Sequence, residues 1–295
     1  MMRPGSAVPV GFHRPNGHYH DIALAAARQA HARAEAKPST TASDKRSPAL
    51  PSISAAFPIW LAEWMKAQKI TLWGAADLRD FDTPLDRSGK RYPYAISFAI
   101  PMNPQIMAGI QTGPNPAYAD EYARVNVLIN AQSIALSTEI RGRGYQSEPL
   151  PASVRTDTVN IKGAFPQKTA ATRAGLGWIG RHCQLITRPY GSWVRLGAVF
   201  TDLELPCGPA LENNYCGRCT KCVEACPAKA LKGRKWYPGL PREEILDVLA
   251  CDRWKKEHYF QYHKGHNCGI CSAVCPHGLK VLKKNQAVKN DLYNR

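Results

Sequence analysis

Apolar residues recur at helical spacing over residues 117–143, in the longest periodic stretch of the chain. Residues spaced three and four apart share one face of a helix, so this stretch predicts an amphipathic helix that ends near Gly142 and Gly144. We assign its apolar stripe to the protein core rather than to a cofactor site. The stripe consists of Tyr118, Tyr122, Val125, Ile129, Leu136 and Ile140.

Shorter apolar segments surround this helix. Residues 60–65 carry Trp and Leu at helical spacing, whereas 70–78 and 94–100 are compact apolar runs typical of strands. Residues 101–116 are rich in Pro, Asn and Gly and predict a long loop. The alternation of strands and helices between residues 53 and 205 predicts an α/β or layered α+β domain.

The two ends of the chain differ from this middle part. Residues 1–52 combine an alanine-rich segment with a polar, proline-bounded linker, which predicts a flexible basic extension. Residues 206–295 hold nine of the ten cysteines, eight of which are candidate ligands, and they end in a basic tail. We therefore expect three regions: 1–52, 53–205 and 206–295.

Composition narrows the class of protein. No run of about 18 apolar residues predicts a membrane span, and the N-terminal residues lack the apolar segment of a secretory signal, so we expect a cytoplasmic protein. The formal charge of +16 favours a polyanionic partner such as tRNA. The alternative is that basic residues balance negatively charged metal clusters, or lie in the tails.

The strongest chemical signal is the cysteine pattern. Residues 216–227 read CGRCTKCVEACP, and residues 268–276 read CGICSAVCP. The first run has the C-x2-C-x2-C-x3-C-P spacing by which ferredoxins hold [4Fe-4S] clusters, with the fourth cysteine reaching to a second cluster. Two clusters need eight thiolates, and Cys251 is the natural eighth.

A tight loop presents three thiolates to one cube, while the cysteine on the following helix points to the neighbouring cube. We therefore sort the ligands into a first quartet of Cys216, Cys219, Cys222 and Cys275, and a second quartet of Cys226, Cys251, Cys268 and Cys271. Two zinc sites or a disulfide framework are the alternatives, and the x2-x2 spacing favours iron over both. Cys183, expected in a buried strand, and Cys207 are left out of the ligand set.

A glycine-rich segment, AGLGWIG at residues 174–180, precedes the cysteines. Glycines at this spacing permit close approach of the backbone to a planar cofactor or a phosphate. A Rossmann site needs a preceding strand, but residues 168–173 predict a helix, so that site is excluded.

The order of AGLGWIG, YGSWVRLG at 190–197, FTDLEL at 200–205 and the double-cluster cysteines resembles the epoxyqueuosine reductases and the related reductive dehalogenases. The resemblance covers roughly residues 55–280. It implies a nitroreductase-like core that binds cobalamin, followed by a bacterial ferredoxin-like module with two [4Fe-4S] clusters. The helical repeat extension of the better-known epoxyqueuosine reductases has no counterpart here.

By resemblance, a proton-donating aspartate corresponds to Asp157, although its distance from AGLGWIG is longer than in the family. The residues that would line the corrinoid are Gly175, Gly177, Gly180, Tyr190, Gly191, Ser192 and Arg195. Core packing would explain Tyr190 equally well, and an ion pair would explain Arg195 equally well.

The implied activity is that of an iron–sulfur oxidoreductase that takes low-potential electrons from a ferredoxin or flavodoxin and passes them to cobalamin. A leaving group is then removed reductively, as in queuosine synthesis on tRNA. Two alternatives stay open: a reductive dehalogenase-like enzyme that acts on a small molecule, and an electron-transfer protein without cobalamin.

Overall fold

The computed structural model describes residues 57–283. All of them fall in one unit, residues 44–295, so the expected boundary near residue 205 is untested, and the expected extension 1–52 lies outside the described residues. The helices are α2 (Ile59–Ala67), α3 (Pro104–Ala108), α4 (Pro116–Gly142), α5 (Gln167–Arg173), α6 (Lys221–Glu224), α7 (Val248–His258) and α8 (Ile270–Ala273). Two 3-10 turns are η2 (Arg242–Glu244) and η3 (His263–Gly265).

A four-stranded antiparallel sheet in the order β1-β2-β6-β3 organises the first part of the described chain. Its strands are β1 (Leu72–Asp77), β2 (Tyr94–Pro101), β3 (Ser147–Leu150) and β6 (Val194–Thr201). A small hairpin of β4 (Gly177–Ile179) and β5 (Leu185–Thr187) stands apart from it. The antiparallel order makes the fold α+β rather than parallel α/β.

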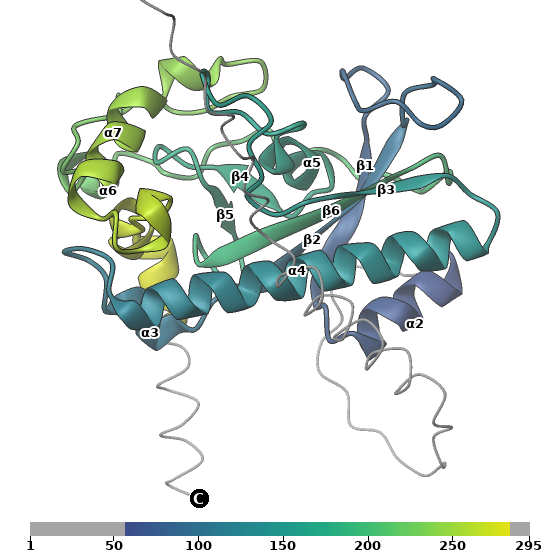
Figure 1. The fold of residues 1–295 in the computed structure, drawn as a ribbon, viewed down its shortest axis with the longest axis horizontal. Helices are drawn as coiled ribbons and strands as arrows, with labels where there is room; N and C mark the ends of the chain where they lie inside the picture. The colour runs from purple at the N-terminus through teal and green to yellow at the C-terminus, as the bar shows by residue number, and fades with distance from the viewer. Residues whose placement is uncertain (1–56, 284–295) are drawn as a thin grey trace, which may run out of the picture. The chain divides into compact units, whose positions relative to one another are not determined.

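Both faces of the sheet are covered. The long helix α4 runs across one face and α5 lies on the other (Figure 1). Val125, Ile129 and Leu136 of the predicted stripe are fully buried between α4 and the sheet, whereas Tyr122 is partly exposed. Phe165 and Phe200 pack edge to face, with ring centroids 5.3 Å apart, in the opposite layer. The prediction of α4 is therefore confirmed to within a residue at each end.

Two local predictions were wrong, on residues 101–116 and on Cys183. The expected loop 101–116 contains α3, because the Asn103 side chain accepts the Gln105 N–H and caps this short helix. Farther along the chain, η2 is followed by α7, which begins after the Asp247 cap and carries Cys251 in its first turn. Cys183 is buried, but it lies in the β4–β5 turn with φ 60° rather than in a strand.

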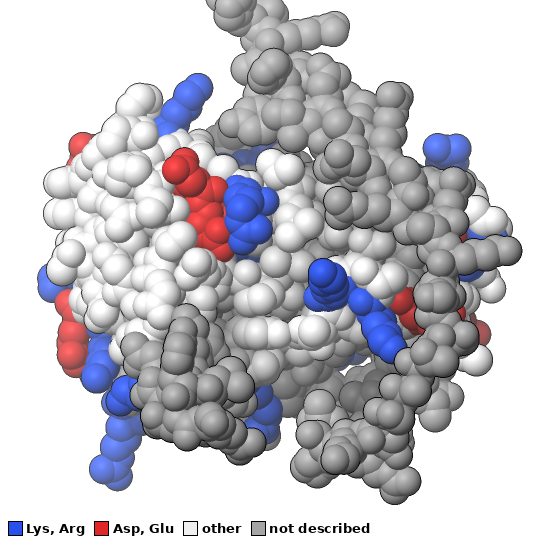
Figure 2. Space-filling model, turned by 90° about the horizontal axis from the view of Figure 1, so that it is seen from below, with Lys and Arg blue, Asp and Glu red and all other residues white. Residues whose placement is uncertain are grey.

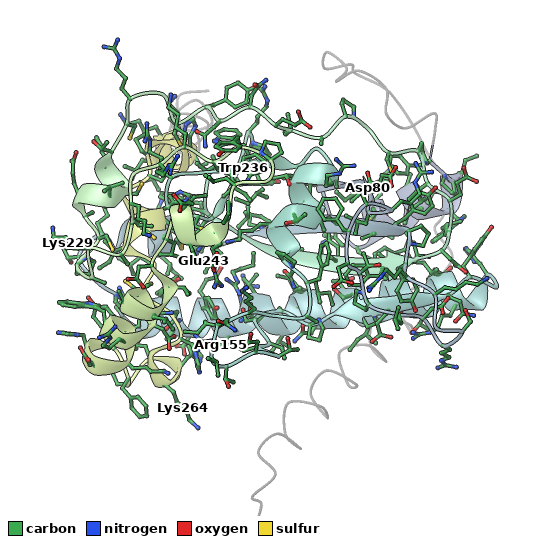
Figure 3. The ribbon with its side chains drawn as sticks, turned by 90° about the horizontal axis from the view of Figure 1, so that it is seen from above. Asp80, Arg155, Lys229, Trp236, Glu243 and Lys264 are labelled. Carbon is green, nitrogen blue, oxygen red and sulfur yellow. The ribbon has the colours of Figure 1, made fainter. Side chains whose placement is uncertain are left out.

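The cysteine-bearing segments gather at one end of the sheet, where α6, α7 and α8 lie close together (Figure 1). Figure 3 shows Lys229 and Lys264 on this side of the molecule and Asp80 at the far end of the sheet. Within residues 57–283, none of the helices combines the length and apolarity needed to cross a lipid bilayer.

Candidate iron–sulfur site

The first quartet is formed around one short loop. Burial first, and then the neighbouring thiols of Cys275, Cys216 and Cys219, raise the pKa of the Cys222 thiol to about 12. Cys216 packs against a small buried cluster that contains Cys275 and Trp178. The four predicted members are therefore neighbours. Gly217 and Arg218, in the loop between Cys216 and Cys219, are exposed, so this loop lies at the surface.

The second quartet is assembled from three separate segments. Burial raises the pKa of Cys271 well above that of a free thiol, and the charges of Cys268 and Cys251, followed by those of Cys222 and Cys226, add to the increase. The Cys268 pKa is raised to about 11 by burial first, with Cys251 and Cys226 contributing. The predicted partners therefore lie together, and they border the first quartet.

The backbone explains why Gly269 follows Cys268. Gly269 has φ 83° and is the N-cap of α8, and a Cβ atom there would lie 2.5 Å from the Ile110 side chain. The left-handed conformation and the close approach both require glycine. Gly217, after Cys216, has φ 58° for the same turning role.

No disulfide joins any of the ten cysteines, all of which lie in the described residues. The same residues contain no group of three His, Cys, Asp or Glu side chains arranged around a single metal ion. Cys207 is partly buried, and its thiol donates to the Leu205 carbonyl. Cys183 accepts a bond from Lys168 Nζ at 3.4 Å.

A cavity of about 190 Å³ opens beside the second quartet, and all four of its cysteines line it. Two buried polar side chains on its wall, His182 and Asn267, have atoms without a hydrogen-bond partner among the described residues. Buried polar groups are normally paired. Four thiols together with orphaned N–H donors fit a sulfur-rich, negatively charged group, so the residues present fit a [4Fe-4S] cube.

Tyr122 on α4 lines the same cavity, and the sequence patterns had assigned it to the core. The Arg195 guanidinium lies 4.1 Å from its ring centroid, and its hydroxyl is 3.1 Å from Ser153 Oγ. Desolvation raises the pKa of Tyr122, but the Arg195 charge and the hydrogen bonds from Ser153 and Asn126 outweigh it, so the net pKa lies below the usual value. Tyr122 is thus a stronger acid than free tyrosine.

Tyr118, one turn earlier on α4, also lines the cavity. Burial raises its pKa, and the nearby cysteines raise it further. Arg195 lowers the pKa of both phenols, but it lies over the Tyr122 ring, and only Tyr122 also has the hydrogen bonds from Ser153 and Asn126. The contact between Arg195 and Tyr122 joins distant parts of the chain. The one signal in the sequence is that Tyr122 lies four residues after Tyr118, on the same face of α4.

The predicted corrinoid residues do not form one surface. Ser192 and Arg195 line the cavity, but the other five do not. A Cβ at Gly177 would lie 2.1 Å from the Ile186 carbonyl oxygen, and one at Gly191 would lie 2.3 Å from the His277 carbonyl oxygen. Protein atoms therefore occupy the space that these glycines leave.

The remaining predicted positions, Gly175, Gly180 and Tyr190, do not line the cavity either. A Cβ at Gly180 would lie 2.8 Å from the His182 ring, Gly175 is an exposed turn residue with φ 74°, and Tyr190 bonds Thr71 at 2.7 Å. The corrinoid role of these residues stays a prediction.

Asp157 lies in a surface turn and does not line the cavity. Its carboxylate accepts the backbone and side-chain N–H groups of Asn160 and the backbone N–H of Val159. The bonds from Asn160, followed by the one from Val159, lower the Asp157 pKa. In this conformation Asp157 holds a turn together.

The chain was compared with known proteins. Residues 215–278 match the family model of the 4Fe-4S double cluster binding domain, a range that contains all eight predicted ligands. Epoxyqueuosine reductase of Synechocystis sp. is 33% identical over 143 residues, covering 44% of this chain and 46% of that protein. The Pseudomonas aeruginosa enzyme is 34% identical over 185 residues, covering 58% and 46%.

Among solved structures, the catabolic reductive dehalogenase NpRdhA matches with a TM-score of 0.56 and 18% identity, covering 74% of this chain and 32% of that protein. This likeness concerns the fold. The predicted resemblance to epoxyqueuosine reductases and reductive dehalogenases is confirmed, as is the double [4Fe-4S] module. The chain spans about half the length of the curated relatives it matches, 46% of each of the two described above.

Proposed function

We propose that this chain is an iron–sulfur reductase that passes low-potential electrons through two [4Fe-4S] clusters to a corrinoid-type site for reductive removal of a leaving group. The epoxyqueuosine reductases are the proteins whose activity it resembles most. One observation carries the proposal: the second cysteine quartet shares a cavity with the acidified phenol of Tyr122. The cube that would deliver the electrons and the phenol that would deliver the proton therefore lie beside each other.

We assign the cluster ligands as the sequence predicts. Cys216, Cys219, Cys222 and Cys275 bind the first cube, and Cys226, Cys251, Cys268 and Cys271 bind the second. The partly exposed first cube receives electrons from a ferredoxin or flavodoxin, because its loop is the more accessible of the two. The module itself comprises residues 206–295, after the sheet domain of 53–205.

Tyr122 supplies the proton. Reductive cleavage of a carbon–oxygen or carbon–halogen bond leaves negative charge on the departing group, and a positioned acid lowers the barrier by protonating it. Arg195 orients and acidifies the phenol, and Ser153 holds its hydroxyl. Asp157, the donor that the resemblance implies, is ionised and bonded in its turn, which supports Tyr122 over Asp157 in this role.

A corrinoid is the electron acceptor that the likeness to reductive dehalogenases suggests. When bound, it would supply a strongly reducing metal centre. The cavity of about 190 Å³ beside the second quartet is the space assigned to the second cube, and it is smaller than the roughly 300–1,000 Å³ of sites for drug-sized ligands, so a corrinoid would have to bind outside this cavity. Ser192 and Arg195 are the two predicted corrinoid residues on the cavity wall.

These same observations favour a second candidate function, a cobalamin-free electron-transfer protein. A reductive dehalogenase-like enzyme would share the fold but act on a small molecule. tRNA is the partner that the epoxyqueuosine reductase likeness suggests, and the charge of +16 is compatible with it. On the face shown in Figure 2, described basic and acidic residues are scattered rather than gathered in one basic area.

Anaerobic purification with metal analysis tests the first step. Two cubes require roughly eight irons and eight sulfides per chain. Addition of cobalamin should then shift the corrinoid absorption spectrum, and salt-sensitive binding of a tRNA should separate an RNA substrate from a small one. Two cubes with no spectral shift would leave the electron-transfer protein as the function, and zinc in place of iron would refute both.

The role of Tyr122 has its own test. Tyr122→Phe keeps the ring and removes the acid, so reduction of an epoxyqueuosine-containing RNA should slow by about 100-fold or more. Tyr118→Phe is the matched control on the same helix and cavity, and it should change the rate far less. An ultraviolet titration should show that the low phenol pKa is lost in Tyr122→Phe and kept in Tyr118→Phe. Equal effects of the two substitutions on the rate would contradict this role.

A further inference from the structure

His182 is a buried imidazole with one bonded and one unbonded nitrogen. Its side chain is 2% exposed. Nδ1 accepts the backbone N–H of Gln184 at 3.1 Å, so Nδ1 carries no proton. A neutral imidazole has one N–H, which therefore resides on Nε2. Nε2 has no hydrogen-bond partner among the described residues.

The direction of this N–H is fixed by its surroundings. The β4–β5 turn that carries His182 is closed by the bonds Gly180 N to Gln184 O and Cys183 N to Gly180 O, both 2.9 Å. The ring packs on Gly180, where a Cβ would lie 2.8 Å from its Cε1 atom. Glycine at 180 thus makes room for the imidazole, a role that the sequence pattern had assigned to a cofactor.

The open side of His182 is the cavity of the second quartet. His182 lines this cavity together with Cys226, Cys251, Cys268 and Cys271. A buried donor that lacks an acceptor destabilises the fold, so an acceptor in the cavity resolves the orphaned N–H. The sulfur atoms of an iron–sulfur cube are acceptors of this kind.

We propose that the Nε2–H of His182 donates a hydrogen bond to a sulfur of the second cube and thereby raises the reduction potential of that cube above that of the first. The proposal rests on the two cubes of the proposed function. A hydrogen bond stabilises the reduced cube, which carries one more negative charge. A single electron moves from the first cube to the second, no bond is broken, and the proton stays on His182.

The first quartet offers a natural comparison. His277 lies two residues after Cys275, and its ring packs against Trp178 with centroids 5.1 Å apart. This ring is partly exposed and is held by the backbone of Tyr215, whereas the His182 ring is buried and its Nε2–H has no partner among the described residues. His277 therefore has a partner in the protein, and a substitution there should leave the second cube unaffected.

The experiment is a redox titration of the full chain, loaded anaerobically with iron and sulfide and followed by electron paramagnetic resonance. The second cube is identified as the signal lost in Cys251→Ser. In His182→Leu the equilibrium constant for reducing that cube should fall about tenfold, which is about 59 mV for one electron. His182→Gln, which keeps a donor, should restore most of the potential, and His277→Leu should not move it.

A second measurement detects the hydrogen bond itself. Chain labelled with ¹⁵N-histidine should show a nitrogen coupling and an exchangeable proton coupling on the reduced second cube, and both should vanish in His182→Leu. Two intact cubes without these couplings, or an unchanged potential in His182→Leu, would overturn the inference while leaving the proposed function standing. A chain that binds no iron would instead overturn the proposed function.

Discussion

The sheet region, residues 57–205, and the cluster region, residues 206–283, are held together differently. The sheet region has a 27-residue helix and a large apolar core with many fully buried side chains. In the cluster region α6 and α8 are four residues each, and the buried apolar side chains are few: one small cluster contains Cys222, Cys226, Ala230 and Leu231, and Ile245, Ile270, Ala273 and Cys275 are buried outside it. Helices this short are marginal without tertiary support.

This difference shows where the folding free energy of each region comes from. Burial of apolar surface stabilises the sheet region directly. The cluster region gathers thiols whose pKa values are raised by burial, and binding of iron is what makes their association favourable. We therefore expect the two regions to respond in opposite ways to metal removal and to loss of apolar contacts.

The largest expected effect is that of iron removal. Chelation should abolish the protection from hydrogen exchange in residues 206–283, because metal binding and folding are coupled there. Residues 57–205 should keep most of their protection. Hydrogen-exchange mass spectrometry on the holo and apo chains measures both. Loss of protection across the sheet at the same rate would remove the distinction between the regions.

A core truncation should act on the sheet region. Ile129 on α4 is fully buried, so Ile129→Ala should lower the free energy of unfolding by about 2–5 kcal/mol without reducing the iron content. Ile134 lies on the same helix and is 40% exposed, so Ile134→Ala should change stability by about 0.5 kcal/mol or less. Denaturant titration distinguishes the two, and equal losses would contradict the assigned core.

A smaller effect is expected where the regions join. Asp252 on α7 is buried and bonds Arg155, which precedes α5, at 2.7 Å. Burial raises the pKa of Asp252, but the bonds from Arg155 and Lys256 lower it to about 2. Figure 3 shows Arg155 on the side of the molecule where α7 lies. Asp252→Asn should destabilise the holo chain by about 1–3 kcal/mol, because cations there lose their partner.

The control for this junction is an exposed pair. Glu243 bonds Arg242 at 2.8 Å and is largely exposed, so Glu243→Gln should cost about 0–1 kcal/mol. Thermal unfolding under anaerobic conditions, with iron release followed in parallel, measures both variants. If Glu243→Gln destabilised the chain more than Asp252→Asn, this would contradict the placement of the junction at Asp252 and Arg155.

The smallest expected effect is a pH dependence confined to the sheet region. Burial raises the pKa of Glu121, but the bonds from Arg124 and the Asn103 N–H outweigh it, so the folded pKa is lowered. Because the pKa of Glu121 is lower in the folded chain than the value of about 4.3 in the unfolded chain, its ionised form stabilises the fold. This stability is fully present above the unfolded pKa and is lost as the pH falls through the folded pKa. Glu121→Gln should flatten this acid limb of the unfolding curve, and an unchanged limb would contradict it.

Sequence reasoning succeeded where neighbours in the chain are neighbours in space. The cysteine spacing of residues 216–227 and the stripe on α4 are local features, and the family model matches the first while the structure contains the second. Even Cys251 could be predicted, because two cubes need eight thiols. The ligand sets themselves stay a prediction, although the thiols of each set lie together.

It was incomplete where tertiary packing decides. The assignment of the AGLGWIG glycines to a cofactor stays a prediction, and the structure adds packing reasons that the pattern did not show: Gly177 leaves room for its partner strand and Gly180 for the His182 ring. The acidity of Tyr122 depends on Arg195, which is 73 positions away in the sequence. Periodicity can place a residue on a face, but it cannot say which charge lies over that face.

Reciprocal hydrogen bonds join residues 192–193 of the sheet region to Ser272 of the cluster region. Ser192 Oγ donates to the Ser272 carbonyl and Ser272 Oγ donates to the Ser192 carbonyl, while Trp193 Nε1 donates to the same Ser272 oxygen. The backbone of His277 also closes on Gly191, where no side chain fits. The cysteine-bearing region is therefore not independent of the sheet region. A chimera that joins it to another protein would lose these reciprocal hydrogen bonds and would need equivalent ones in the new protein.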